Sequence, residues 1–568
     1  MWLINKLWEW VGDAALFQAH RWQKKFEAAL ERPKEVQEQL LERIIATHKS
    51  TQFGKDHRFG GIKTVADFRR HIPVMKYEDH EPYIAQMRQG KFDALVNAKT
   101  VHMFAMTSGT TATRKYIPVT PQYLNDYRRG WTIWGVRVYD QHVEARLKPI
   151  LQLNSDCDEF RTEAGIPCGS VSGLTAQMQK RVVRRLYCVP AVACKIKDAT
   201  AKMYVALRLA LTKQMIGMAI SANPSTFIKF AQMGDDAKED LIRDLYDGTL
   251  SQHYTISQEV RDALGKKIRK RHVDRARQLE EVVRRTGHLY PKDAWPNFVQ
   301  IGNWMGGSVG LYLRQYPKYF DTTKTFIRDL GLIASEGRFT ISLEDNTPGG
   351  VLDVQSHFFE FIPESEINSD KPTVLLAHEL QEGHNYYILP TTANGLYRYN
   401  IFDVVRVLGR YKGTPVVEFL NKGANFANLT GEKLSEYHVV AAVRQALHDT
   451  DHMVSAYTVA PCWDDPPYYG LFVERADFRD EAQAQSLADA VDRHLRHINM
   501  EYDTKRDSQR LAPLQAQLLP TGAWARWDRE RLAKCGGTPE QYKRPCLIAD
   551  PKFKETMPMG REEAVTVG

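Results

Sequence analysis

The chain has 568 residues, of which 43% are hydrophobic and 10% aromatic, a composition that builds a core and excludes a disordered protein. Its net charge of +8 is mild for this length and suits an anionic small substrate as well as a nucleic acid. The seven cysteines form no Cys-x-x-Cys pair, which predicts reduced thiols and a cytoplasmic protein.

The N-terminal segment is apolar in part, but no run in the chain reaches the length of a membrane span. Lys6, Glu9 and Asp13 interrupt the apolar run that a signal peptide needs. We expect a helix docked on the body of the protein, with weak association with a membrane surface as the alternative. One face of this helix would carry Trp2, Leu3, Leu7, Trp8 and Val11.

The first 300 residues are predicted to be mainly helical. Pro33 opens a helix, residues 121–150 carry a further helical pattern, and residues 170–300 alternate amphipathic segments with Gly and Pro breaks. The basic stretch 266–272 follows apolar residues at helical spacing. It therefore predicts a helix with a solvated basic face, and we expect no nucleic-acid binding.

From residue 326 the hydrophobic period changes to that of strands. The predicted strands are 331–334, 358–362, 373–376, 385–389, 404–408 and 415–419. A boundary follows, and the remainder alternates helix 432–447, strand 453–460, strand 470–475 and helix 481–498. The pattern predicts a large domain over 1–420, a hinge at 421–424 and a smaller α+β domain over 425–568.

The most distinctive segment runs from Thr107 to Lys115 and reads Thr-Ser-Gly-Thr-Thr-Ala-Thr-Arg-Lys after an apolar run. Its backbone N–H groups and hydroxyls suit phosphate binding, and Lys115 adds a point charge, so ATP is the expected first substrate. It is not a Walker loop, because a single glycine is present and Ile117-Pro118 favours extended chain. A Ser/Thr-rich surface turn is the alternative interpretation.

Three further segments carry candidate ligands. Ser335-Glu336 ends a predicted strand, where a carboxylate suits Mg²⁺ on phosphates; an ordinary turn is the alternative. Arg398 could meet a carboxylate or phosphate and Asp403 ribose hydroxyls, against the alternative of a surface Arg–Asp pair. Lys433 stands at a helix start beyond the boundary, where it would reach across a cleft or simply be solvated.

These segments, in this order, resemble those of the plant auxin-responsive acyl-acid amido synthetases, the Gretchen Hagen family, and their bacterial relatives. The hydroxyl-rich loop resembles the Ser-Gly-Thr-Thr-Gly-x-Pro-Lys signature of adenylate-forming enzymes. Segments 77–84, 357–363, 391–399 and 541–545 resemble further family motifs: Tyr-Glu-Asp-His-Glu-Pro-Tyr-Ile, His-Phe-Phe-Glu-Phe-Ile-Pro, Thr-Thr-Ala-Asn-Gly-Leu-Tyr-Arg-Tyr and Gln-Tyr-Lys-Arg-Pro.

The resemblance implies a mixed α/β (α+β) fold of the adenylate-forming ligase type. It has a large N-terminal domain with sheets, helices and a small barrel, a smaller mobile C-terminal domain, and ATP between them. Glu336 would hold Mg²⁺ and, with Lys433 and Lys543, support catalysis. ATP would be bound by Thr107, Ser108, Gly109, Thr110, Thr111, Lys115, Ser335, Asp403 and Phe419.

The resemblance implies a ligase that adenylates a carboxylic acid and transfers the acyl group to an amine such as an amino acid. An acyl–coenzyme A ligase shares the first half-reaction and is one alternative. A catalytically weak nucleotide-binding protein is another, because Ala112 and Phe402 replace glycines of the family motifs.

Overall fold

The computed structural model of the chain describes residues 2–107, 115–179, 181–367, 369–423, 426–430, 432, 434–535 and 542–558. The fold is mixed α/β, and its elements form two compact units. Among the described residues, the first unit holds those up to 401 together with 405–419. The second holds 402–404 and those from 420 onward. The sequence-based boundaries at 420 and 425 stay a prediction.

The first unit begins with helices, as the sequence predicts. Pro33 occupies the first turn of its helix, where the missing N–H costs nothing. These helices pack on the larger of the unit's two apolar cores. They are α1 (Trp2–Leu30), α2 (Pro33–His48), α3 (Gln52–Asp56), α4 (Val65–His71) and α5 (Tyr77–Arg88).

A four-stranded sheet in the order β2-β1-β5-β4 follows the helices. Strand β1 (Met103–Thr107) pairs antiparallel with β2 (Lys115–Val119) and parallel with β5 (Pro167–Gly169), and β4 is Phe160–Arg161. Helix α6 (Pro121–Gln141) leaves β2 directly, and the Thr120 side chain caps its first turn. The pairing with β2 and the helix that follows it fix the position of the end of β1 in the first unit.

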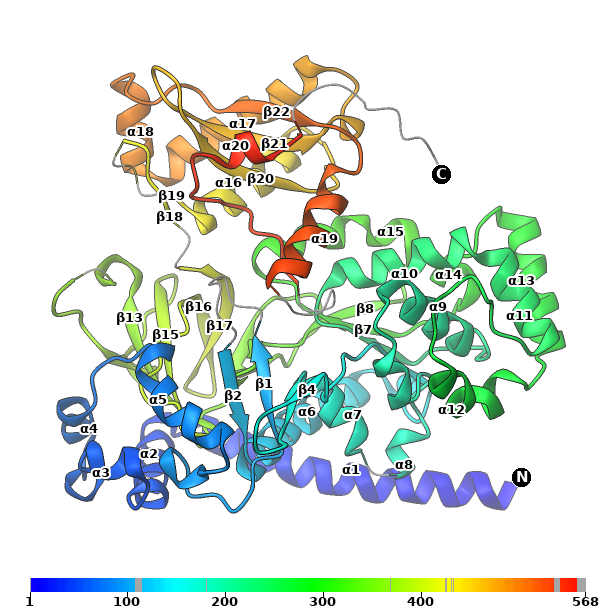
Figure 1. Ribbon diagram of the computed structural model, residues 1–568, viewed down its shortest axis with the longest axis horizontal. Helices are drawn as coiled ribbons and strands as arrows, with labels where there is room; N and C mark the ends of the chain where they lie inside the picture. The colour runs from blue at the N-terminus through cyan, green and yellow to red at the C-terminus, as the bar shows by residue number, and fades with distance from the viewer. Residues whose placement is uncertain are drawn as a thin grey trace. The chain divides into compact units, whose positions relative to one another are not determined.

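A parallel sheet in the order β3-β6-β7-β8 forms the second part of this unit, with its helices gathered beside it (Figure 1). In α12, Val260, Leu264 and Ile268 are buried while Lys266 and Lys267 are exposed, which confirms the predicted helix with a solvated basic face. The strands are β3 (Ile150–Gln152), β6 (Met218–Ile220), β7 (Gln300–Asn303) and β8 (Phe326–Asp329). The helices are α7 (Val171–Gln177), α8 (Arg181–Arg184), α9 (Ala199–Ala210), α10 (Pro224–Asp236), α11 (Lys238–Asp247), α12 (Gln258–Ile268), α13 (Val273–Thr286), α14 (Pro291–Ala294) and α15 (Tyr316–Tyr319).

A seven-stranded sheet in the order β11-β12-β17-β16-β15-β13-β14 completes the strand-rich region predicted from residue 326. A short hairpin of β9 (Ile333–Ala334) and β10 (Gly337–Arg338) precedes it. The strands are β11 (Thr340–Ile341), β12 (Gly350–Leu352), β13 (His357–Pro363), β14 (Leu375–Leu376), β15 (Asn385–Thr392), β16 (Asp403–Tyr411) and β17 (Thr414–Lys422).

The second unit is a small α+β body with a three-stranded sheet in the order β20-β21-β22. Helix α16 starts at Glu436, four residues after the predicted start at 432, because the Ser435 side chain caps it by accepting the His438 N–H. The elements are β18 (Phe426–Ala427), β19 (Leu434–Ser435), α16 (Glu436–Asp449), β20 (Tyr457–Cys462), β21 (Tyr468–Glu474), α17 (Glu481–Ile498), α18 (Met500–Asp507), β22 (Gln515–Leu519), α19 (Ala523–Cys535) and α20 (Phe553–Thr556).

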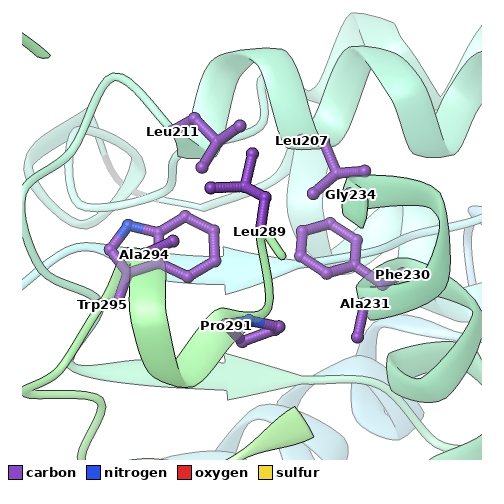
Figure 2. A pocket seen from close by; sticks show the side chains of 9 residues that line it. All are labelled: Leu207, Leu211, Phe230, Ala231, Gly234, Leu289, Pro291, Ala294 and Trp295. Carbon is purple, nitrogen blue, oxygen red and sulfur yellow. The ribbon is translucent and has the colours of Figure 1, made fainter. Parts of the chain in front are cut away.

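A narrow apolar pocket lies in the second core of the first unit, between α9, α10 and α14. Figure 2 shows that every side chain facing it is apolar. Leu289 projects into its centre and is 2% exposed. The indole N–H of Trp295 is already bonded to the Lys213 carbonyl, so the apolar walls make this pocket a feature of packing.

Leu289→Ala should therefore destabilise the protein by about 2–5 kcal/mol, since the truncated side chain leaves an enlarged cavity that the surrounding helices cannot close. Urea unfolding followed by circular dichroism measures the change. Leu408→Ala, at a leucine that is 37% exposed, is the matched control and should cost less than about 1 kcal/mol. Equal losses in both variants would contradict the packing role of Leu289.

Candidate functional site

The predicted phosphate loop is flanked by paired strand ends. Thr107 closes β1 and stands opposite Lys115, the first residue of β2. Ser108, Gly109, Thr110 and Thr111 lie outside the described residues. The Lys115 ammonium lies 5.5 Å from the centre of the Tyr77 ring, a cation–π arrangement that holds this side chain beside α5.

The predicted Ser-Glu-Gly site is the tip of the β9–β10 hairpin. Ala334 pairs with Gly337, so Ser335 and Glu336 form a two-residue turn. Position 337 requires glycine, because a Cβ there would lie 2.7 Å from the ring of buried His357.

Two hydrogen bonds bring this turn to the end of β1. The Ser335 hydroxyl donates to the Met106 carbonyl over 3.2 Å, and the Tyr123 hydroxyl donates to the Ser335 carbonyl over 3.0 Å. Ser335 and Glu336 are therefore placed beside the strand that leads into the hydroxyl-rich loop, although some 230 residues separate the two segments in sequence.

Glu336 is 7% exposed and keeps its carboxylate near the Tyr123 hydroxyl. Burial raises the pKa of Tyr123 well above its ordinary value, and the charges of Tyr127 and Glu336 raise it further. Tyr123 thus stays a neutral donor at any physiological pH. In the described part of the chain no three His, Cys, Asp or Glu side chains gather as a metal site.

Helix α6 supplies residues that the sequence interpretation missed. Tyr123, Tyr127 and Trp131 recur every four residues and so share one helix face. The Tyr123 and Tyr127 rings stack 5.8 Å apart, and the guanidinium of Arg338 lies 4.6 Å from the Trp131 ring. The spacing of the aromatic residues is a signal that could have revealed this row.

Arg338 is a buried cation at the end of the hairpin, 2% exposed. Its Nη2 donates to the Leu330 carbonyl over 2.7 Å. A Cβ at Gly130 would lie 2.6 Å from the Arg338 Cδ, so this glycine makes room for the side chain. Burial lowers the pKa of Arg338 to about 10, and the group remains charged at neutral pH.

Arg398 is occupied by a structural contact. Its Nε donates to the Glu360 carboxylate over 2.7 Å and its Nη1 to the Ile72 carbonyl over 2.6 Å. Arg69 donates to the same carboxylate over 2.8 Å. Of the two partners suggested by the sequence, a carboxylate or a phosphate, the structure supplies the carboxylate.

Three of the family-like segments meet at this point. The Tyr397 N–H donates to the His80 Nε2 over 3.0 Å, and the other ring nitrogen of His80 bonds the Lys76 carbonyl. Burial lowers the pKa of His80 to about 4, which keeps the ring neutral and able to accept. Segments 77–84, 357–363 and 391–399 thus share one buried polar cluster around Glu360.

Asp403 opens β16 and is 2% exposed. Its carboxylate forms an ion pair with Lys422 at the end of β17. The Gly423 N–H donates to the Phe402 carbonyl over 2.7 Å. Phe402 has a φ of +59°, in the left-handed region that favours glycine, so the chain keeps a glycine-like backbone where the family motif has glycine.

The remaining predicted residues lie in different places. Phe419 is half-buried near the end of β17, where Gly306 approaches its carbonyl so closely that a Cβ would lie 2.9 Å away. Lys543 is half-buried in the second unit. Lys433 lies outside the described residues. The structure thus brings Ser335 and Glu336 to the end of β1 in the first unit, while Asp403 and Lys543 belong to the second.

Among the described residues, no helix combines the length and the apolar character needed to cross a bilayer.

Comparison with known proteins covers nearly the whole chain. Residues 22–325 match the GH3 family N-terminal domain, 350–422 the central domain and 437–552 the C-terminal domain. The chain is 22% identical to the jasmonoyl–L-amino acid synthetase JAR6 of Nicotiana attenuata, over 92% of this chain and 93% of that protein. It is 24% identical to the probable indole-3-acetic acid-amido synthetase GH3.11 of Oryza sativa subsp. japonica, over 91% of each.

A solved structure shows the same fold. The GH3.15 acyl acid amido synthetase superposes with a TM-score of 0.81 at 19% identity, over 94% of each chain. Because the first of these domain matches alone spans more than half of the sequence, the chain belongs to the GH3 family.

Proposed function

We propose that this protein is an ATP-dependent ligase that adenylates a carboxylic acid and transfers the acyl group to an amine, with an amino acid as the expected acceptor. One observation carries the proposal. The Ser335–Glu336 turn is hydrogen-bonded to the end of β1, the strand that leads in sequence to the hydroxyl-rich loop predicted to hold phosphates. Membership of the GH3 family supports it.

In the first half-reaction a carboxylate oxygen of the acid attacks the α-phosphorus of ATP. The bond from that phosphorus to the oxygen bridging to the β-phosphate breaks, and pyrophosphate leaves. No base is needed, because a carboxylic acid with a pKa near ~4 is already ionised at neutral pH. The protein has to align the two anions and stabilise the charge that develops.

The residues have the following proposed roles. Thr107 to Thr111 and Lys115 hold phosphates, Ser335 contacts the α-phosphate, Asp403 holds the ribose and Phe419 lies beside the nucleotide. Lys433 and Lys543 support the transfer from the second unit. The aromatic row of α6 begins with Tyr123, which bonds the Ser335 carbonyl, and this row contacts the non-carboxylate part of the acid substrate.

Mg²⁺ fits the donor set at the turn. The buried carboxylate of Glu336 suits a Mg²⁺ ion that takes its remaining ligands from phosphates and water. When bound, the ion neutralises phosphate charge and so lowers the barrier to attack. Glu336 would hold it, and the Tyr123 hydroxyl, which stays protonated, keeps the turn in place.

In the second half-reaction the amine nitrogen attacks the acyl carbon, the bond from that carbon to the phosphate oxygen breaks and AMP leaves. The nitrogen gives up one proton. We place the reaction in the cytoplasm, where ATP is available. The cysteines support this, since six of the seven are buried thiols that are not joined in disulfides: Cys157, Cys168, Cys188, Cys194, Cys462 and Cys546.

A panel of acids and amines tests the proposal. The purified protein is incubated with ATP and Mg²⁺, and AMP, pyrophosphate and product mass are measured. We expect AMP release that requires both an acid and an amine, with an amide of the summed mass less water. AMP release that requires coenzyme A in place of the amine would identify a thioester ligase. Release with no acid or amine pair would overturn the proposal.

Asp403→Ala should weaken ATP binding by about tenfold or more, because the ribose hydroxyls lose their acceptor and Lys422 loses its partner. Isothermal titration with ATP measures the dissociation constant. Asp370→Ala, at an exposed aspartate of the first unit, is the matched control. Unchanged binding in Asp403→Ala would remove this residue from the site.

Phe402→Gly should leave the ATP dissociation constant within about threefold of wild type, because the left-handed backbone that orients Asp403 is one that glycine adopts freely. Phe402→Val should be less stable than Phe402→Gly by about 1–2 kcal/mol, since a β-branched residue is strained there. Urea unfolding and ATP titration are the measurements. Equal stability of the two variants would contradict the left-handed backbone.

A further inference from the structure

A fully buried carboxylate lies one residue before Lys433 in the sequence. Glu432 is 0% exposed and accepts the N–H groups of Leu429 over 2.6 Å and Thr430 over 2.8 Å. The Thr430 hydroxyl adds a third bond of 2.9 Å. Burial opposes ionisation, but these bonds and the Tyr469 hydroxyl hold the pKa of Glu432 below its ordinary value. Leu429 and Thr430 are therefore held by a charged group.

The same carboxylate is tied to the core of the second unit. The Tyr469 hydroxyl of β21 donates to the Glu432 Oε1. The Asn499 side chain donates to the Glu432 backbone carbonyl over 3.3 Å. Tyr469 is buried in the central strand of the sheet. Glu432, which is bonded to it, therefore has little freedom to move within this unit.

A second buried glutamate holds the segment that follows Lys543. Glu436, the first residue of α16, is 8% exposed and accepts the Cys546 N–H over 2.6 Å. The Pro545 carbonyl accepts the Thr458 hydroxyl over 2.9 Å. Arg544 forms a bidentate ion pair with Asp528 of α19, with bonds of 2.6 Å and 3.1 Å. Residues 544–546, which follow Lys543 directly, are thus all held by hydrogen bonds.

The two glutamates lie four residues apart on either side of Ser435, the N-cap of α16. Glu436 lies in the first turn of the helix, where the helix dipole favours negative charge. Desolvating a carboxylate costs several kcal/mol unless hydrogen bonds offset it. Glu432 offsets that cost with two backbone N–H groups and Glu436 with one, in each case from a segment next to a predicted catalytic lysine.

We propose that Glu432 and Glu436 are positioning residues, the first fixing the segment that leads into Lys433 and the second the segment that leads out of Lys543. This inference rests on the proposed function for the roles of the two lysines. Each glutamate thereby anchors the chain next to one of the lysines in the sequence, so that less binding energy is spent on ordering that part of the chain during adenylation.

Double-mutant cycles test the two positioning roles separately. Tyr469→Phe removes one hydroxyl from the Glu432 carboxylate, and Glu436→Ala removes the acceptor for Cys546. Each is combined with Lys433→Ala and with Lys543→Ala, and acid-dependent pyrophosphate release and ATP binding are measured. Tyr468→Phe is the matched control, because it removes a neighbouring hydroxyl of β21 that bonds Lys554 over 2.7 Å.

We expect Tyr469→Phe to lower kcat by about tenfold or more with ATP affinity unchanged, since small misplacements of a reacting group are costly. This loss of kcat on Tyr469→Phe substitution should vanish when Lys433 is already alanine and persist when Lys543 is alanine. Glu436→Ala should show the reverse pattern, with recovery in Glu436→Gln, whose amide oxygen still accepts an N–H. Equal losses in both lysine backgrounds, or equal losses in Tyr468→Phe, would overturn the proposal.

Labelling with acetic anhydride gives a readout that needs no enzymatic turnover. Mass spectrometry follows acetylation of Lys433 and Lys543 in the folded full-length variants. We expect Tyr469→Phe to change the labelling rate of Lys433 alone and Glu436→Ala that of Lys543 alone. If the wild type lacks ligase activity but shows this selectivity, the proposed function fails and the positioning roles stand. If activity is present and labelling is unselective, the positioning roles fail.

Discussion

The ion pair between Glu360 and Arg398 is the contact on which the first unit depends most. Both side chains are almost fully buried, and Glu360 also accepts Arg69 of α4. It joins β13 of the seven-stranded sheet to the segment that leads into β16, and through that segment to the neutral ring of His80 in α5. Removing one partner of such a pair costs about 3–5 kcal/mol, because the other charge is left buried and alone.

That cluster explains why motifs far apart in the sequence occur together. The Phe-Glu-Phe strand supplies the acceptor and the Leu-Tyr-Arg-Tyr segment supplies the donor, while the N-terminal Tyr-Glu-Asp-His segment supplies a histidine that accepts the Tyr397 N–H. The same N-terminal segment also supplies Tyr77, whose ring lies 5.5 Å from the ammonium of Lys115. The role of the three motifs is to join helix α5, strand β13 and the segment around Arg398 within the first unit.

Local patterns in the sequence predicted much of the fold. Helix α17 spans the predicted 481–498, and the long strands β13, β15, β16 and β17 lie where period-two alternation indicates them. Boundaries were less accurate where a cap decides them: Ser435 moves the start of α16, and strand β20 begins at Tyr457, four residues after the predicted 453. Capping and strand pairing depend on partners that hydrophobic periodicity does not report.

For the candidate site, the sequence singled out Ser335 and Glu336 at the end of a predicted strand, with an ordinary turn as the alternative, but it did not show what surrounds them. The partner of Arg398 is 38 residues away and on another strand, and Tyr123 reaches Ser335 across 212 residues. Such contacts follow from the packing of whole elements. The resemblance to a family supplied the expected ligands, whereas the roles of Tyr123, Arg338 and Glu432 emerge only from the folded chain.

The fit between Gly130 and Arg338 also restricts how this protein can change over time. A methyl group at 130 would collide with the arginine, and a shorter residue at 338 would leave a hole beside Trp131. A substitution at either position alone would lower the stability of the protein. In related chains, a larger residue at position 130 should occur together with a smaller residue at position 338. The two columns of an alignment should therefore vary together.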